Sequence, residues 1–299
     1  MWTKKNIPDL SGKTIIVTGA NAGIGYETAL ALYEAGAHVI IASRDEAKAA
    51  EAISKLEATG CKGSLEFIAL NLSNLGEIKR FADEFKAKHT RLDVLINNAG
   101  VMLTPASKTD DGYELQFGTN HIGHFALTGH LYPVLKATEG ARIVTVSSMA
   151  YLRGSINFDN LKSEQDYDAM REYCQSKLAN VLFSLQLQRR IDAAGDGVLS
   201  LAVQPGANKT ELARYMDKAV YDAAVKRTGP LMEPWQGALP SLYAAVEPAA
   251  KPYVLYSPDQ DGGYRGYPAE FEITSGGRDE VIAQRLWEYS EKETGVVYP

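Results

Sequence analysis

The sequence contains little cysteine, no excess of positive charge and no long apolar run. Its two cysteines, Cys61 and Cys174, match neither a CxxC pair nor a metal-binding spacing, which favours a reducing compartment. A formal net charge of −6 argues against nucleic acids and anionic membrane surfaces as partners. No apolar run is long enough to span a bilayer, and residues 1–13 contain no apolar signal core. We therefore expect a cytoplasmic protein with neither a membrane nor a nucleic-acid partner.

The residues that are present describe an ordinary globular domain. Apolar residues make up 45% of the 299 residues and charged residues 23%, which is enough to bury a substantial core. No linker, repeat or low-complexity segment divides the chain, so residues 1–299 are predicted to form one domain.

Short β-branched runs alternate with helical patterns along most of the chain. This alternation predicts parallel βαβ units, and hence an α/β fold with a doubly wound parallel sheet. The predicted strands cover 14–18, 37–43, 65–72, 92–100, 141–148, 197–206 and 251–257. The predicted helices cover 26–36, 44–60, 75–89, 113–136, 165–194 and 278–293.

The alternation lapses over residues 206–235. This segment has helix-forming residues, contains Met and Tyr, and ends in Gly and Pro. We interpret it as a helical lid over a substrate site, with an excursion on the surface as the alternative.

A glycine-rich loop at 18–25 follows the first predicted strand and opens the first helix. Gly19, Gly23 and Gly25 have a spacing that differs from the G-x-G-x-x-G fingerprint. Glycines at such a junction let the backbone approach a pyrophosphate, whose charge the helix N-terminus stabilises. A phosphate site is therefore predicted, although a structural turn would also use glycine.

The end of the second predicted strand indicates which dinucleotide binds. NAD sites place an acidic residue there, whereas NADP sites omit it and supply an arginine for the 2′-phosphate. Here Ser43 is followed by Arg44, with Asp45 next to it. The prediction is NADP(H), with a solvated arginine at a helix start as the alternative.

A catalytic pair is suggested by Tyr173 and Lys177, which share one helix face because they are four residues apart. A nearby ammonium favours the phenolate, so we expect Lys177 to lower the pKa of Tyr173 towards neutrality. Such a tyrosine can exchange a proton with an alcohol oxygen, which Ser148 would hold by a hydrogen bond. Ser147 competes with Ser148, but adjacent strand residues point in opposite directions.

These motifs together resemble the short-chain dehydrogenase/reductase family over its whole length. The motifs occur in the family's order, and they are TGxxxGxG at 18–25, NNAG at 97–100, Asn120, Ser148, YxxxK at 173–177 and PG at 205–206. The resemblance implies a Rossmann-type fold. It also implies that Tyr173 is the acid/base, that Lys177 holds the nicotinamide ribose, that Ser148 positions substrate and that Asn120 helps hold a water in a proton relay. Thr210 resembles the residue that bonds the nicotinamide carboxamide.

The predicted site residues are therefore of two kinds. The catalytic residues are Asn120, Ser148, Tyr173 and Lys177. The cofactor-binding residues are Gly19, Asn21, Gly23, Ile24, Gly25, Ser43, Arg44, Asn71, Leu72, Asn98, Ala99, Gly100, Tyr173, Lys177, Pro205, Gly206 and Thr210. No metal ligand is predicted, since His121 and His124 lack a third partner and are expected to serve in helix packing against the site.

The stretches at 119–128, 173–187 and 286–295 look most like the retinol dehydrogenase branch. The resemblance implies apolar aldehydes, ketones or alcohols as substrates, with NADP(H) preferred. It also implies that helices over 113–136 and 165–194 can pair across a two-fold axis, so a homo-oligomer is one expectation. The chain departs from the pattern at Asn71, where an Asp is usual, and at Ala22, where a basic residue would support the 2′-phosphate.

The predicted function is an NADP(H)-dependent oxidoreductase that interconverts a carbonyl and an alcohol. The first alternative is an NADP(H)-binding redox sensor without turnover, which would need the glycine loop but not the acid/base residues. A lyase or epimerase on the same fold is the second alternative.

Overall fold

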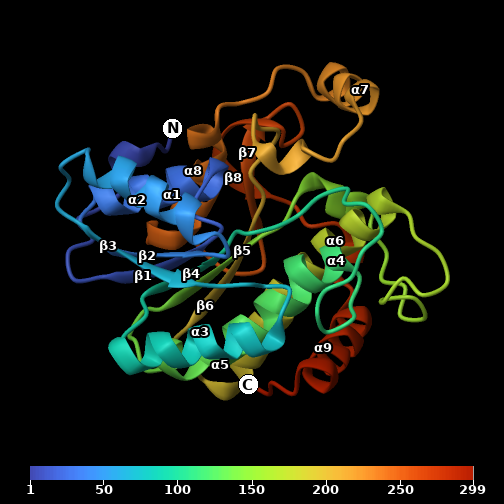
Figure 1. The fold of residues 1–299 in the computed structure, drawn as a ribbon, viewed down its shortest axis with the longest axis horizontal. Helices are drawn as coiled ribbons and strands as arrows, with labels where there is room; N and C mark the ends of the chain where they lie inside the picture. Colours follow the sequence, from blue (N-terminus) through green and yellow to red (C-terminus); the bar gives the residue numbers. More distant parts are fainter. Residues whose placement is uncertain (299) are drawn as a thin grey trace.

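A central eight-stranded sheet organises the chain, and the computed structural model describes it over residues 1–298 (Figure 1). The strand order is β3-β2-β1-β4-β5-β6-β7-β8, and every neighbouring pair is parallel except β7 and β8. The strands are β1 (Thr14–Thr18), β2 (His38–Ser43), β3 (Ser64–Ala69), β4 (Val94–Asn97), β5 (Arg142–Val146), β6 (Leu199–Val203), β7 (Leu255–Gln260) and β8 (Arg265–Phe271). This order confirms the predicted doubly wound α/β fold in a single domain.

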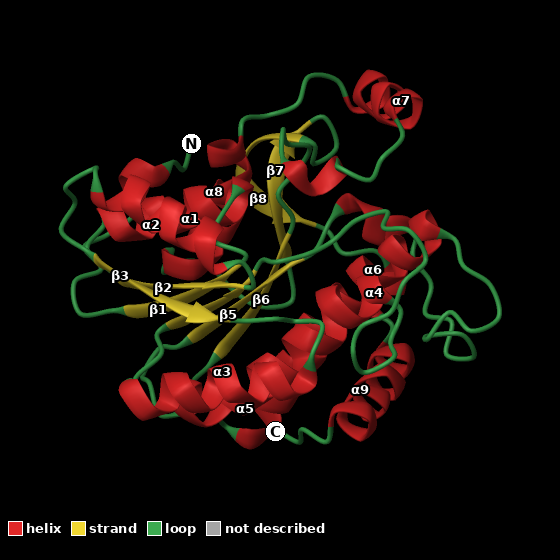
Figure 2. Ribbon diagram, viewed as in Figure 1, coloured by secondary structure: helices red, strands yellow, loops and turns green. Residues whose placement is uncertain are grey.

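Helices cover both faces of the sheet (Figure 2). One face packs against α1, α2 and α8, and the other against α3, α5 and α6, each through its own apolar core. The helices are α1 (Gly23–Glu34), α2 (Glu46–Glu57), α3 (Leu75–Lys88), α4 (Leu115–Phe117), α5 (Gly123–Lys136), α6 (Ala169–Ala194), α7 (Lys218–Thr228), α8 (Pro234–Val246) and α9 (Glu280–Thr294). Strands buried on both faces explain the continuous apolar runs of the sequence.

The carboxyl-terminal third differs from the prediction in two places. The strand predicted over 251–257 is not the last one, because β7 turns back into the antiparallel strand β8. Pro258 and Pro268 face each other in this hairpin. Because proline is rare within strands, the sequence of the hairpin resembles a loop. Helix α8 was also missed, because it begins with Pro234 and contains Pro240.

The helix predicted over 113–136 is interrupted by a wider turn. Helix α4 runs into a π-helical turn, Gly118–Ile122, and this turn continues directly into α5. Asn120 lies in the middle of the π-helical turn. Turns of this kind are frequent at functional sites, because the extra residue changes where side chains and carbonyls point.

Segment 206–235 contains a 3-10 turn at Glu211–Ala213 and the short helix α7, which stands away from the sheet (Figure 1). This helix, α7, buries none of its residues. The helical content agrees with the expectation for this segment, and its role as a lid remains a prediction. Within residues 1–298, no helix combines the length and the apolar character needed to cross a membrane.

Candidate active site

The glycine loop is held so close to neighbouring backbone that side chains do not fit. A Cβ on Gly25 would lie 2.3 Å from the carbonyl oxygen of Gly19, and one on Gly19 would lie 3.0 Å from the Cα of Ala99. Gly19 and Gly23 both have positive φ angles. The glycines therefore keep side chains out of the turn that leads into α1, which suits the binding of a phosphate by backbone amides.

Thr18 fastens the glycine loop to the loop after β4. Its Oγ1 accepts hydrogen bonds from the backbone amides of Asn98 and Ala99, both at 2.9 Å. The side chain of Asn98 in turn donates to the carbonyl of Thr18 at 2.8 Å. The predicted cofactor residues Gly19, Asn98 and Ala99 thus lie together at the carboxyl ends of β1 and β4.

The end of β2 presents Ser43 and Arg44 beside this loop, because the amide of Gly19 donates to the carbonyl of Ala42 at 2.8 Å. The Ser43 hydroxyl is buried and has no hydrogen-bond partner within residues 1–298. Arg44 is exposed and forms no ion pair in the described chain. Asp45 caps α2 by accepting from the amide of Lys48 at 3.1 Å, so its carboxylate is directed to that helix.

The loop after β3 places Asn71 and Leu72 at the same end of the sheet. Asn71 Oδ1 accepts from the hydroxyl of Ser73 at 2.7 Å and stabilises the turn. The carbonyl of Leu72 lies where a Cβ on Gly123 would be only 2.4 Å away, so this loop packs on the start of α5. Both residues therefore lie just beyond the carboxyl end of β3, at the same end of the sheet as the glycine loop.

Asn120 joins the loop after β4 to helix α6. Its Oδ1 accepts from the amide of Val101 at 2.8 Å, and its Nδ2 donates to the carbonyl of Val101 and to Ser176 Oγ, both at 3.0 Å. A Cβ on Gly100 would lie 3.1 Å from Asn120 Oδ1 and 3.6 Å from Lys177 Nζ. The structure thus brings Gly100, Asn120 and Lys177 together, and the role of Asn120 in a proton relay stays a prediction.

Ser147 and Ser148 point to different partners, as predicted. Ser147 Oγ donates to the carbonyl of Lys177 at 2.7 Å and helps to dock α6 on β5. Ser148 Oγ accepts from the amide of Ala150 at 3.2 Å and hydrogen bonds with the phenol of Tyr173. Of the two serines, Ser148 is therefore the one at the tyrosine.

Tyr173 and Lys177 are both buried, with Lys177 Nζ 5.8 Å from the centre of the tyrosine ring. Burial raises the pKa of Tyr173 to about 12, and the hydrogen bond with Ser148 opposes this only in part. Burial also lowers the pKa of Lys177 to about 8. The expectation that Lys177 brings the Tyr173 pKa towards neutrality is therefore wrong here, because desolvation raises the Tyr173 pKa and the Lys177 ammonium, 5.8 Å from the ring centre, does not offset it.

Apolar side chains surround Tyr173. The small cluster around it is formed by Ala150 and Cys174, with the partly buried Met102, Leu103 and Met170 packed against them. Cys174 is thus a packed thiol, and burial raises its pKa.

The loop after β6 contains the last predicted cofactor residues, and one of them contacts the glycine loop. Pro205 and Gly206 follow the end of the strand at Val203, and Gly206 takes a positive φ of 73°. Thr210 reaches back, so that a Cβ on Gly23 would lie 3.4 Å from its methyl carbon. Residues nearly two hundred positions apart in the chain therefore border one site.

His124 links the glycine loop to the π-helical turn, a role that its sequence position did not reveal. Its Nε2 lies 2.9 Å from Thr18 Oγ1, and its Nδ1 lies 3.0 Å from the carbonyl oxygen of Asn120. Burial lowers the pKa of His124 to about 4, so the ring is neutral at pH 7. Because Nδ1–H donates to the carbonyl of Asn120, Nε2 of the neutral ring carries no proton and accepts a hydrogen bond from the Thr18 hydroxyl. His121 instead packs deeper, with Nε2 3.1 Å from Ser290 Oγ.

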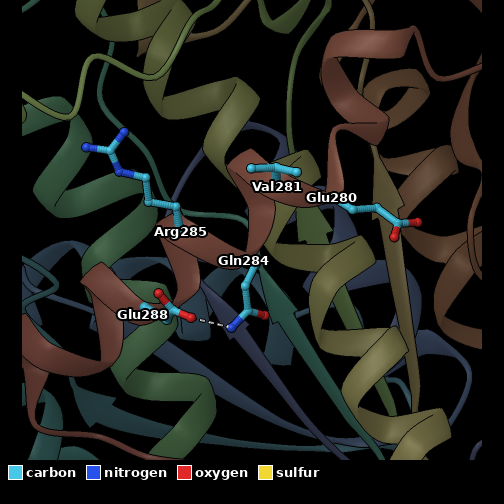
Figure 3. A pocket seen from close by; sticks show the side chains of 5 residues that line it. All are labelled: Glu280, Val281, Gln284, Arg285 and Glu288. Carbon is cyan, nitrogen blue, oxygen red and sulfur yellow. Dashed lines mark hydrogen bonds between the residues drawn. The ribbon is translucent and has the colours of Figure 1, made fainter.

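A separate hollow on α9 lies outside this arrangement (Figure 3). Gln284 there donates to Glu288 at 2.7 Å, and the hollow contains no histidine, cysteine or serine. It lacks the groups that the chemistry of a dehydrogenase needs. The residues that line it are Glu280, Val281, Gln284, Arg285 and Glu288.

The site can hold a dinucleotide on the evidence of its own atoms. The glycines pack so closely on neighbouring protein atoms that the loop has no room for side chains at these positions, and the buried Ser43 hydroxyl has no hydrogen-bond partner among residues 1–298. A free arginine follows at the strand end, where the 2′-position of an adenine ribose is recognised in such folds. Lys177, Tyr173 and Ser148 lie at the other end of this surface, near Gly100.

Comparisons with known proteins agree with this geometry. The short chain dehydrogenase family model matches residues 13–220. Mouse retinol dehydrogenase 14 is 38% identical over 96% of this chain and 87% of its own length. Human retinol dehydrogenase 11 is 40% identical over 94% of this chain and 85% of its own, and mouse polyprenol dehydrogenase is 38% identical over 97% and 86%.

Solved structures show the same likeness. A crystal structure of an uncharacterised protein from Mycobacterium paratuberculosis superposes with a TM-score of 0.84 and 37% identity, covering 100% of this chain and 99% of that one. The RhlG/NADP complex from Pseudomonas aeruginosa has a TM-score of 0.65 and 26% identity over 80% and 91%. Proteins of this family are oxidoreductases that bind a nicotinamide cofactor and act on small molecules. The chain therefore belongs to the short chain dehydrogenase family, and within it to the retinol dehydrogenase-like branch.

Proposed function

We propose that the protein is an NADP(H)-dependent oxidoreductase that interconverts an apolar aldehyde or ketone with its alcohol. The observation that carries the proposal is the meeting of Tyr173, Ser148, Lys177 and Asn120 beside a glycine cradle at the carboxyl ends of the strands. Ligands of doubly wound sheets bind at this end. The apolar cluster of Met102, Leu103 and Met170 around Tyr173 favours an apolar substrate.

The proposed chemistry divides between the bound nicotinamide, which supplies or takes the hydride, and the side chains of this chain. With a pKa of about 12, Tyr173 is protonated at pH 7, the state that donates a proton to a carbonyl oxygen. Ser148 holds the same oxygen through its hydroxyl. Lys177 and Asn120 both contact the loop around Gly100. Together with Tyr173 they form the buried base of the site, which we call its floor.

The preference for NADP(H) rests on the end of β2. Arg44 is free, Asp45 is occupied as a helix cap, and no acidic side chain takes the place that an NAD site needs. An arginine–phosphate pair is charge-assisted and can be bidentate, which favours the 2′-phosphate. The likeness to an NADP complex at 26% identity supports the same choice.

Titration of NADPH and NADH against the wild-type chain and Arg44→Ala tests this preference. We expect NADPH to bind at least about tenfold more tightly to the wild type, equivalent to about 1.4 kcal/mol. Arg44→Ala should lose that preference while its NADH affinity stays unchanged. Lys48→Ala, which removes a nearby exposed cation on α2, is the matched control. A preference that survives Arg44→Ala would remove the argument.

Turnover is tested by following NADPH absorbance across a panel of aldehydes, ketones and alcohols. A substrate that is reduced with saturation kinetics supports the oxidoreductase proposal. Tight NADPH binding without turnover on any member of the panel would favour the redox-sensing alternative, because that function needs the cradle and not the acid/base residues.

A further inference from the structure

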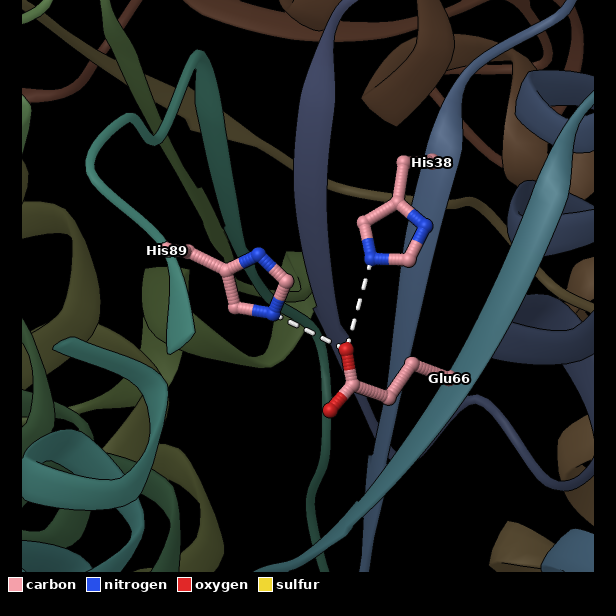
Figure 4. Close-up of side chains that lie close together, drawn as sticks. All are labelled: His38, Glu66 and His89. Atoms are coloured by element: carbon pink, nitrogen blue, oxygen red, sulfur yellow. Dashed lines mark hydrogen bonds and ion pairs between the residues drawn. The ribbon is translucent and has the colours of Figure 1, made fainter. Parts of the chain in front are cut away.

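Three side chains of the types that bind metal ions lie close together at the other end of the sheet from the proposed active site (Figure 4). His38 is the first residue of β2, Glu66 lies in β3, and His89 immediately follows α3. One nitrogen or oxygen atom from each residue lies within 4.8 Å of the others. The catalytic residues proposed above lie at the carboxyl ends of the strands, so the two sites are separate.

Strand register brings the first two residues to one face. His38 pairs with Ser64 across the parallel strands, and side chains two residues apart share a face, so Glu66 lies on the face of His38. The same face packs on α3, because Ile40 belongs to the core that contains Phe85. His89 stacks on Phe85 with ring centres 4.8 Å apart, which fixes its ring over the two strands.

Both imidazoles turn to the same carboxylate oxygen (Figure 4). Glu66 Oε2 lies 3.4 Å from His38 Nε2 and 2.9 Å from His89 Nε2. Tetrahedral zinc with bonds of about 2.0–2.1 Å places its ligand atoms roughly 3.3 Å apart, so these separations need little adjustment. Lys88 binds the other oxygen, Oε1, at 3.0 Å and leaves Oε2 to the histidines.

His38 carries the second observation that points to a ligand. Its Nδ1 lies 2.6 Å from Ser64 Oγ, which orients the ring and directs Nε2 at Glu66. That Nε2 atom is buried and has no hydrogen-bond partner among the described residues, despite its distance of 3.4 Å from the carboxylate. Metal-bound histidines are typically held in this way, with a partner that fixes one imidazole nitrogen while the other is directed at the remaining ligands.

We propose that His38, Glu66 and His89 form a three-ligand zinc site at the amino-terminal edge of the sheet. The three side chains retain 27%, 23% and 17% of their surface, so water can complete the coordination. Two imidazoles and one carboxylate suit zinc better than magnesium or calcium, which prefer oxygen ligands. A bound ion would join the edge strand β3 to β2 and α3 and so hold this corner of the fold.

Isothermal titration of chelator-treated protein with Zn²⁺ alone tests the proposal. We expect one saturable site per chain, and a loss of affinity of at least about tenfold in His38→Ala and in His89→Ala. His130→Ala, a histidine on α5 outside the cluster, is the matched control and should bind as the wild type does. With excess Zn²⁺, the midpoint temperature of thermal unfolding should rise by several degrees in the wild type and in His130→Ala. It should not rise in His38→Ala or His89→Ala.

Cys61 is the competing explanation for any zinc binding, because it is a partly exposed thiol on the loop that precedes β3. Cys61→Ser should keep the affinity, and the Co²⁺ derivative should lack a thiolate-to-metal charge-transfer band. If zinc fails to bind, or binds equally well to both histidine variants, the cluster is only an ion pair of Glu66 with Lys88 and His89. Loss of binding in Cys61→Ser would likewise overturn the assignment. NADPH turnover is a separate readout, so failure here leaves the proposed function standing.

Discussion

The floor of the proposed active site and segment 206–235 beside it are built in opposite ways. On the floor, Asn120, Tyr173 and Lys177 are buried, and loops from β1 and β4 are fastened through Thr18. Helix α7 of segment 206–235 buries nothing, and Val220 on it is 49% exposed. A catalytic group needs a fixed position, whereas a segment that admits substrate needs low local stability. The buried catalytic residues and the exposed helix α7 thus meet these two requirements in different parts of the structure.

The contacts of segment 206–235 with the rest of the chain lie mainly near its two ends. Its end is held by Arg265, which donates to the carbonyls of Thr228 and Pro230. Lys218 pairs with Asp222 at 2.7 Å on the surface, where an ion pair adds little stability. Thr210 at the start of the segment lies against Gly23. The segment is thus held at its ends, and α7 in its middle has no buried residue.

The largest effect should follow from Tyr173→Phe on the floor. The change deletes only the phenolic oxygen, so we expect turnover to fall by about 10²–10⁴-fold while NADPH affinity and thermal stability stay near wild type. Steady-state rates and NADPH titrations measure both properties. Tyr167→Phe, outside the floor, serves as the control and should keep its turnover. Near-normal kcat in Tyr173→Phe would end the acid/base assignment.

The next effect concerns the pH dependence of stability through His124. Because its folded pKa is about 4 and its ordinary value is 6.5, the unfolded chain takes up a proton between these values and the folded chain does not. This contribution to stability is present above pH 6.5 and is lost as pH falls towards 4. At about 1.4 kcal/mol per pKa unit, the loss amounts to about 3 kcal/mol.

Urea unfolding of the wild type and of His124→Asn from pH 7.5 to pH 4.5 isolates the contribution of His124 to the free energy of unfolding. Glu114 titrates in the same pH range, but it is present in both chains. Burial raises the pKa of Glu114 to about 7, so its own contribution runs the other way, and the difference between the chains cancels it. The variant should lose less stability than the wild type on acidification. A constant difference across the range would contradict the predicted role of His124.

The smallest effect on stability should come from α7. Val220→Ser replaces an exposed side chain, so the free energy of unfolding should change by less than about 0.5 kcal/mol. Val144→Ser, at a fully buried strand position, is the contrasting control and should be far more destabilising. Chemical denaturation of both variants gives the two values.

Hydrogen exchange with and without NADPH addresses the lid directly. Amides of 206–235 should exchange rapidly in the free protein and slow on binding, whereas amides of β1 and β4 should be protected throughout. Equal protection of 206–235 in both states would leave the segment as a surface excursion.

Much of the fold was readable because it depends on local pattern. Apolar runs and turn residues identify strands β1 to β6, and glycine positions identify a loop where backbone must approach backbone. The i, i+4 spacing placed Tyr173 and Lys177 on one helix face without knowledge of their surroundings. Helix α8 and strand β8 escaped detection because their prolines imitate loop sequence.

The sequence by itself determined which groups the site contains, and tertiary structure decided their state. Desolvation depends on what packs from other elements, so the pKa directions of Tyr173 and Lys177 could not be derived from spacing. The link from Thr18 through His124 to Asn120 joins three elements, and its middle member looked like a packing residue. His38, Glu66 and His89 likewise meet only because β2, β3 and α3 do, since strand register and helix docking, not sequence distance, bring their atoms together.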